Sequence, residues 1–284
     1  MKIYKDLTIF FVSFFSKPNI EKIIKKINPK IKILIIDNAQ EKGFKNYFEK
    51  KYKNVKVIVS KSNKGESGGI NIGFRNIKTK YALKLDSDVI LKKTTIDKFI
   101  QTANNVKDFV ILAPQHEKSF YKSDFISKQK SIFKNLQLMK LVHGQFMFFK
   151  MQNVKKVGYF DENFFLYFEE TDFCFRAYKR KQKIYVLTDT NVIHKGGWSV
   201  NLDNKLEIEA NKHWHFMWSK FYYFKKNHSL FVAYQKTLID FFASLIKYAF
   251  FFLIDYRKRI IFYNKISGLV NSIMGNKPFK RISN

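Results

Sequence analysis

The sequence has 284 residues, of which 46% are hydrophobic, and a formal net charge of +30. Its length and apolar content exclude a disordered chain, because they allow a buried core for one large domain or one domain with an appendage. A single cysteine, Cys174, excludes an internal disulfide framework and a cysteine-based zinc site. The excess of lysine favours polyanionic surroundings, either nucleic acid or an anionic membrane surface.

The first third of the chain alternates short β-rich runs with stretches of helical length. The β-rich runs are residues 7–15, 32–38, 55–60 and 81–91. Between them lie "NIEKIIKKI" and "GGINIGFRNI", which have the length of helices. This alternation predicts an α/β fold with a mostly parallel sheet covered by helices on both faces, in which ligands bind at the carboxyl ends of the strands.

Polar side chains fall at the expected strand ends, at Asp37, Asn38, Asp86 and Asp88. Asp86 and Asp88 share a face if their strand continues, and both reach one cation if the chain turns there. Their oxygen ligands suit Mg²⁺ or Mn²⁺, and either cation suits a diphosphate. An ordinary polar turn is the alternative, and it is favoured for a D-x-D motif taken alone.

A glycine-rich segment, "NKGESGGINIG", contains Asn63 and Gly65 and opens the second of these helices. Its backbone amides and the helix N-terminus are suited to face a phosphate. The segment matches neither a P-loop nor a dinucleotide-binding fingerprint, and flexible turn chemistry explains its glycines equally well.

Farther along, the sequence predicts a strand over 143–150, a helix within 157–181 and a strand that ends at His194. A histidine at a strand end is more often packed or solvated than a ligand. Beside a metal-binding D-x-D motif, however, its imidazole would complete a mixed oxygen and nitrogen shell and shift the preference toward Mn²⁺.

The stretch "FEETD" concentrates acids at the start of the helix expected within 157–181. Glu169 and Asp172 share one helix face, while Glu170 points roughly 100° away. Glu170 lies among aromatic residues that would raise its pKa by desolvation, so it is the candidate general base. For Asp172 we favour a structural role, in which it pairs with Arg176 one turn later.

Taken in order, these motifs resemble an inverting glycosyltransferase of family 2 with the GT-A fold, of the rhamnosyltransferase-like type that builds cell-surface polysaccharides. The resemblance runs from about residue 7 to about residue 227 and rests on the order and spacing of its segments. They read "ILIIDNAQEKG", "SNKGESGGINIGFRN", "LKLDSDVIL", "HGQFMFFK", "VGYFDENFFLYFEETDFCFR" and "VIHKGGWS".

The resemblance implies roles for individual residues on the donor side. Asp37 is placed to read the nucleotide base, with Ser13 and Asn38 close by, and Asn63 and Gly65 belong to the same nucleotide-binding group. Asp86 and Asp88 resemble the pair that lies beneath the donor diphosphate, and Asp88 is the direct ligand of a divalent metal, Mn²⁺ or Mg²⁺. His194 resembles the third metal ligand.

On the acceptor side, the resemblance places Glu170 where the family's base is typically Asp, which leaves the base assignment between Glu169 and Glu170. It also places Trp198 near the acceptor or donor sugar, with Asp172 and Arg176 as supporting residues. Phe14-Phe15 stands where the family has Tyr-Asn, so one expected polar contact to the nucleotide is missing.

We expect a catalytic domain over residues 1–228, with a nucleotide-binding half up to about 115, and a helical tail over 229–284. Phe241–Ile254 is mostly apolar but too short for a span of roughly twenty residues. Polar residues of this tail fall within about 100° on a helical wheel and leave a broad apolar face. The face either packs on the catalytic domain or lies in a membrane interface.

The predicted function is transfer of a hexose-type sugar from a UDP- or dTDP-sugar to a glycan or lipid-linked acceptor. The enzyme would be cytoplasmic and peripheral on the anionic inner face of the membrane. Two alternatives are a basic nucleic-acid-binding protein and an inactive membrane-associated scaffold. Only six of 53 basic residues are arginine, which argues against nucleic acid, and the retained acids argue against a scaffold.

Overall fold

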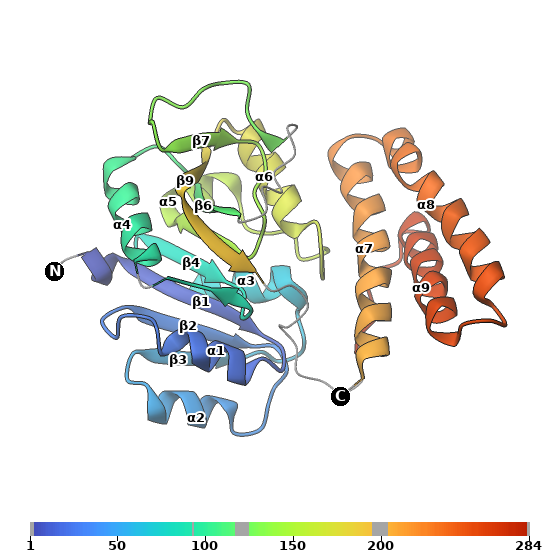
Figure 1. Ribbon diagram of the computed structural model, residues 1–284, viewed down its shortest axis with the longest axis horizontal. Coiled ribbons are helices and arrows are strands. Elements are labelled where there is room, and N and C mark those ends of the chain that lie inside the picture. Colours follow the sequence, from blue (N-terminus) through green and yellow to red (C-terminus); the bar gives the residue numbers. More distant parts are fainter. Residues whose placement is uncertain (1–2, 93, 117–124, 195–203, 283–284) are drawn as a thin grey trace. The chain divides into compact units, whose positions relative to one another are not determined.

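The computed structural model describes residues 3–92, 94–116, 125–194 and 204–282 (Figure 1). The chain divides into two compact units. The first consists of Met1–Lys64, Gly68–Phe160 and Phe173–Asn201, and the second of Gly65–Ser67, Asp161–Asp172 and Leu202–Asn284.

The first unit is built on one sheet, which has nine strands among the described residues. The strands are β1 Leu7–Ser13, β2 Lys32–Asp37, β3 Val55–Val59, β4 Tyr81–Leu85, β5 Val89–Ile90, β6 Ile111–His116, β7 Leu136–Met139, β8 Phe146–Lys150 and β9 Ile184–His194. They run in the order β3-β2-β1-β4-β8-β6-β9-β5, and β7 pairs with β9. The expected α/β fold is confirmed.

Parallel pairing is confined to part of the sheet. The neighbouring strands β3, β2, β1 and β4 are all parallel, as the alternation of strands and helices predicts. Strand β8 then pairs antiparallel with both β4 and β6, and β9 pairs parallel with β6 but antiparallel with β5 and β7. The sheet is therefore mixed, and its second half departs from the mostly parallel arrangement that we expected.

Helices cover both faces of the sheet, because the strand side chains are apolar on each side. Ile9 and Phe11 of β1 point into one core, and Phe10 points into the other. The first core is covered by α1 Lys17–Ile24, α2 Phe44–Lys51 and α4 Thr95–Asn105, and the second by α3 Gly65–Asn76, α5 Met151–Val157 and the later part of α6 Glu169–Lys179. Cys174 is buried in this second core.

The strand expected over residues 81–91 is interrupted. It splits into β4 and β5, and the chain turns at Asp86–Asp88 between them. The turn has a physical reason, since β4 lies between β1 and β8 whereas β5 pairs with the end of β9. Of the two arrangements open to the D-x-D motif, the structure adopts the turn.

The second unit is dominated by three helices, α7 Lys205–Asn227, α8 Leu230–Phe251 and α9 Tyr256–Ile273. Their side-chain caps are Asn204, Ser229 and Asp255, each of which accepts a backbone N–H of the first turn. Helices α7 and α9 approach closely at Gly268, where a Cβ atom would lie 2.2 Å from the carbonyl oxygen of Trp214. This unit begins upstream of the tail that we expected from residue 229.

None of the helices in the described ranges is both long and apolar enough to cross a membrane.

Candidate active site

Buried polar side chains mark the carboxyl ends of the first three strands. Ser13 ends β1, and its Oγ lies 2.9 Å from the Oγ of Ser16. Asn38 follows β2 and accepts a hydrogen bond from the Oγ of Ser60, which follows β3, at 2.9 Å. All four side chains are almost fully buried. Asn38 and Ser60 thus join the ends of β2 and β3, and the backbone N–H of Asn38 donates to the carbonyl oxygen of Ser13 at the end of β1.

Asp37, the last residue of β2, is fully buried and shapes the turn that follows. Its Oδ1 accepts the backbone N–H groups of Ala39 and Gln40, and its Oδ2 accepts that of Glu41, each at 3.0 Å. Burial raises the pKa of this carboxyl, against the opposing effect of the three backbone hydrogen bonds. A carboxylate has about four acceptor positions, so about one remains for a ligand such as a nucleotide base.

The turn between β4 and β5 presents the two aspartates of the D-x-D motif. Asp86 forms an ion pair with Lys84, whose buried ammonium also donates to the carbonyl oxygen of Gly144 at 3.1 Å. Asp88 is nearly buried and lines a cavity of about 290 Å³, whose lining includes Lys22 of α1 and Lys26 of the turn after α1. Asp86 is therefore tied to an internal cation, while Asp88 faces a cavity with two further lysines.

The third expected metal ligand, His194, is brought to this turn by the sheet. Its backbone pairs with Val89, the residue after Asp88, in the β5–β9 ladder. Its side chain is outside the described part of the structure, as is the whole of Trp198. Among the described side chains there is no group of three His, Cys, Asp or Glu that could hold a metal.

The chemistry of this donor set fits a divalent cation. Two carboxylates in one turn and an imidazole at a paired position are oxygen and nitrogen ligands of the kind that Mn²⁺ accepts. The backbone of His194 lies opposite Val89, which directly follows Asp88.

The turn before α6 has an unusual backbone. Tyr167 and Phe168 have φ values of +68° and +64°, in the left-handed region that non-glycine residues rarely occupy. Such conformations persist only where neighbouring contacts enforce them, and they concentrate at functional sites. The two residues immediately precede Glu169 and Glu170, the candidate bases.

Contacts within the second unit hold this turn. The ring of Phe165 stacks on His215 with centroids 4.6 Å apart, and the guanidinium of Arg281 lies 3.6 Å from its centroid. The Oγ of Ser219 donates to the carbonyl oxygen of Leu166 at 2.9 Å. Gly65 has a φ of +67°, and a Cβ atom there would lie 2.2 Å from the carbonyl oxygen of Phe165. Gly65 therefore has a packing role, and its predicted contact with nucleotide stays a prediction.

The acids of α6 occupy different surroundings. Glu169 and Glu170 are partly buried. Burial of Tyr167, and after it the negative charges of these two acids, raise the pKa of Tyr167 to about 12. Asp172 is fully buried and accepts hydrogen bonds from Lys226 Nζ at 2.7 Å and Asn227 Nδ2 at 2.9 Å. Two acidic residues at the helix start are thus partly exposed, and the third is held by α7.

Arg176 and Asp172 have partners that the sequence did not predict. The guanidinium of Arg176 donates to the carbonyl oxygens of Val157 and Tyr159 at 3.1 and 2.9 Å. Lys226 binds Asp172, and it also donates to Asp161 at 2.8 Å. Both residues therefore stabilise the polypeptide around the acidic stretch.

Sequence reasoning missed three residues of this region. Ser60 and Lys84 had a usable signal, since one is a polar residue at a strand end and the other is a lysine inside the apolar run "YALKL". Lys226 had none, because it lies 54 residues from Asp172 along the chain.

Comparisons with known proteins agree with this geometry. The hexosyltransferase Agl10 of low-salt glycan biosynthesis in Haloferax volcanii is 23% identical over 208 residues, which is 66% of this chain and 67% of that protein. The fold resembles that of the mannosyltransferase PcManGT from Pyrobaculum calidifontis, solved with GDP-Man and Mn²⁺, with a TM-score of 0.59, 12% identity and coverage of 96% and 88% of the two chains. It also resembles S. aureus TarS 1-349 with UDP-GlcNAc, with a TM-score of 0.54, 13% identity and coverage of 95% and 92%.

These neighbours are glycosyltransferases with the GT-A fold, which confirms the expected fold. A sequence model of glycosyl transferase family 2 matches residues 9–164, more than half of the chain. The matched stretch includes the ends of β1 to β4 and the D-x-D turn. The chain therefore belongs to glycosyl transferase family 2.

Proposed function

We propose that this glycosyltransferase moves a hexose from a nucleoside diphosphate sugar to a hydroxyl group of a glycan acceptor, with inversion at the anomeric carbon. The observation that carries the proposal is the Asp86–Asp88 turn at the end of β4, beside the backbone position of His194. Agl10 is itself a hexosyltransferase of glycan biosynthesis, and the complexes with GDP-Man and UDP-GlcNAc are those of proteins with this fold.

On the donor side, the first unit supplies the binding groups. Asp37, Ser13 and Asn38 line the edge at which the nucleoside would bind, and Asp88 with His194 would hold Mn²⁺ or Mg²⁺. The ion pair with Lys84 keeps Asp86 oriented beside them. The bound cation would neutralise the diphosphate as it becomes the leaving group.

On the acceptor side, Glu170 takes the proton of the attacking hydroxyl group. The acceptor oxygen forms a bond to the anomeric carbon, the bond from that carbon to the diphosphate oxygen breaks, and the nucleoside diphosphate leaves. A positioned carboxylate contributes about 10² to 10⁴ in rate by this proton transfer. Glu169 is the competing assignment.

Calorimetric titration with UDP, dTDP and GDP, with and without Mn²⁺, tests the donor site. Asp88→Asn should abolish the metal-dependent part of the binding, whereas Asp108→Asn, an exposed aspartate of the same unit, should not change it. Glu170→Gln should bind donor normally and lose transfer by about two orders of magnitude or more. Unchanged metal-dependent binding in Asp88→Asn would refute the donor site at Asp88. If Glu170→Gln is active and Glu169→Gln is inactive, Glu169 is the general base instead of Glu170.

We further propose that the enzyme works at an anionic membrane surface, through the outward face of α8. Large apolar side chains on this face, and Leu253 in the turn that follows α8, are exposed instead of packed: Phe231 70%, Ile239 80%, Phe242 53%, Ile246 70% and Leu253 91%. So large an exposed apolar face indicates an interaction surface. Residues 230–273 contain six basic and two acidic residues, and the chain carries +30, so an anionic surface is complementary whereas a second copy is repelled.

Vesicle flotation tests this location. The full chain should bind vesicles with anionic lipids at low salt and leave them as salt rises. Replacing Ile239, Ile246 and Leu253 with Ser should abolish binding, and the control Ile132→Ser, at an equally exposed position of the first unit, should retain it. Equal binding of the triple variant, or none by the native chain, refutes the membrane surface.

A further inference from the structure

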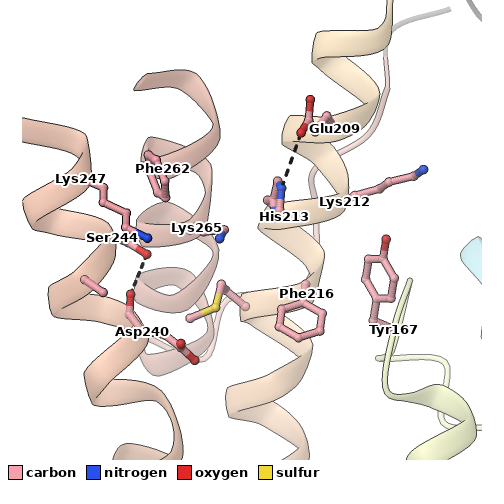
Figure 2. Close-up of a pocket in the computed structure, with 12 residues that line it drawn as sticks. Tyr167, Glu209, Lys212, His213, Phe216, Asp240, Ser244, Lys247, Phe262 and Lys265 are labelled. Atoms are coloured by element: carbon pink, nitrogen blue, oxygen red, sulfur yellow. Dashed lines mark hydrogen bonds and ion pairs between the residues drawn. The ribbon is translucent and has the colours of Figure 1, made fainter. Parts of the chain in front are cut away.

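A pocket of about 400 Å³ lies within the helical unit, outside the residues assigned so far (Figure 2). Helices α7, α8 and α9 form its walls, and Tyr167 of the turn before α6 belongs to its lining. Tyr167 is three residues from Glu170, the candidate base, and two from Glu169, the competing assignment, so the pocket is close to both along the chain.

The pocket concentrates positive charge. Lys247 of α8 and Lys265 of α9 lie over the ring of Phe262, with their ammonium groups 5.6 and 5.3 Å from its centroid. Lys212 and His213 of α7 contribute further basic groups. Among the interactions of the described residues, Lys212, Lys247 and Lys265 have no ion pair.

The two acids in the lining are already engaged by other cations. Asp240 forms an ion pair with Lys220, which is not part of the pocket. Glu209 lies 4.0 Å from His213 and 4.0 Å from Arg257, which is also outside the lining. Both acids of the lining are therefore paired with cations, and two of these cations, Lys220 and Arg257, lie outside the lining. The positive charge of Lys212, Lys247 and Lys265 in the lining therefore exceeds the negative charge left to balance it.

The basic groups of the pocket also disfavour one another's protonated, positively charged forms. Burial lowers the pKa of Lys265, and the charge of Lys247 lowers it further against the attraction of Asp240. Burial lowers the pKa of His213, and the charges of Lys265 and Lys212 act in the same direction against Glu209. A bound anion would relieve this repulsion, because an opposite charge favours the protonated form of each group.

We propose that this pocket binds the phosphate group of a lipid-linked acceptor, which deepens and rests on the proposed function. Lysine ammonium groups bind phosphate as point charges, and the hydroxyl group of Tyr167 stays protonated as a donor. Phe262 and Phe216 add apolar surface to the lining, which suits the first carbons of a lipid chain. A sugar carried on such a phosphate would lie on the side of Tyr167 and hence toward the candidate base.

Titration calorimetry with three probes tests this site, in EDTA and without donor. The probes are geranyl diphosphate, inorganic pyrophosphate and geraniol, which separate the lipid-linked anion from the free anion and from the apolar chain. The full chain should bind geranyl diphosphate, bind pyrophosphate more weakly and ignore geraniol. The double variant Lys247→Gln/Lys265→Gln should bind geranyl diphosphate at least about tenfold more weakly, as expected for the loss of charge-assisted contacts.

The matched control is Lys225→Gln/Lys277→Gln, which removes two exposed lysines of the same unit and should bind like the native chain. Circular dichroism melts establish that both double variants fold. Unchanged affinity in the pocket variant, or competition of UDP or GDP for the geranyl diphosphate site, would overturn the proposal. Equally tight pyrophosphate binding would overturn the lipid-linked source. Because these titrations need neither metal nor turnover, they are independent of the donor-site test, so failure of the proposed function and failure of this pocket give different results.

Discussion

Lys226 connects two acids around the start of α6, and its replacement by Met isolates the contribution of its charge. The ammonium group donates to Asp172 at 2.7 Å and to Asp161 at 2.8 Å. Asp172 has no exposed side-chain surface, and Lys226 is 28% exposed. Met keeps most of the aliphatic stem, so the change removes only the ammonium group from beside a buried carboxylate.

The loss of unfolding free energy in Lys226→Met depends on the hydrogen bonds that Asp172 and Asp161 keep. Removing one partner of a buried ion pair costs about 3–5 kcal/mol. Asp172 keeps a hydrogen bond from Asn227, and Asp161 keeps one from Tyr222 at 3.0 Å. These contacts and the partial exposure of Lys226 place the loss of unfolding free energy near the lower end, at about 3 kcal/mol. For a chain of this size, that lowers Tm by about 6–12 °C.

A double-mutant cycle tests the reasoning. Urea and thermal melts of the full chain would compare Lys226→Met, Asp172→Asn and the double variant, with the exposed neighbour Lys225→Met as control. The double variant should regain most of the lost stability, because a neutral amide no longer needs a cation and still accepts from Asn227. Lys226→Met within about 0.5 kcal/mol of the native chain, or a double variant as unstable as the single one, would refute the argument.

Three further predictions concern stability. The Lys51 ammonium, aided by two tyrosine hydroxyl groups, holds the pKa of Glu21 at about 2. The ionised Glu21 therefore stabilises the folded chain above pH 4.5, and this stabilisation is lost as the pH falls toward 2. The difference in Tm between the native chain and Glu21→Gln should close over that pH range. Burial lowers the pKa of His215 to about 4, so the native chain should lose stability as pH falls from 6.5 to 4, and His215→Gln should lack this loss. Gly268→Ala should lower Tm, because its Cβ would collide with the backbone of Trp214, and an unchanged melt would contradict this.

Much of the first unit could be predicted because its strands are nearly continuous apolar runs. The β1 to β4 strands and the helices between them follow from that pattern, and so do the polar side chains at their ends. At Asp86–Asp88 the sequence allowed either a turn or a continued strand, because the local residues do not decide between the two. The pairing of Val89 with His194 decides it, and that partner is more than a hundred residues away.

The second half of the sheet and the contacts of the acidic stretch could not be predicted from the sequence, because they too depend on partners that are distant along the chain. The antiparallel place of β8 between β4 and β6 depends on register with both strands. The partner of Asp172 was expected one helical turn away, at Arg176, because that spacing is local. The structure also brings Lys226 from α7 to Asp172, and Arg176 binds the carbonyl oxygens before α6, and neither contact has a local spacing that would predict it.

The two proposals for the helical unit meet on α8, whose polarity is arranged opposite to that of an ordinary surface helix. Asp240, Ser244 and Lys247 line the pocket, while Ile239 and Ile246 are exposed. At 100° per residue these two sets are separated by roughly 120°. A packed bundle alone does not require polar residues inside and apolar residues outside. A unit that holds a charged headgroup within the bundle and rests its outer face among lipid chains requires both, because a lipid-linked acceptor presents its phosphate and its apolar chain at the same interface.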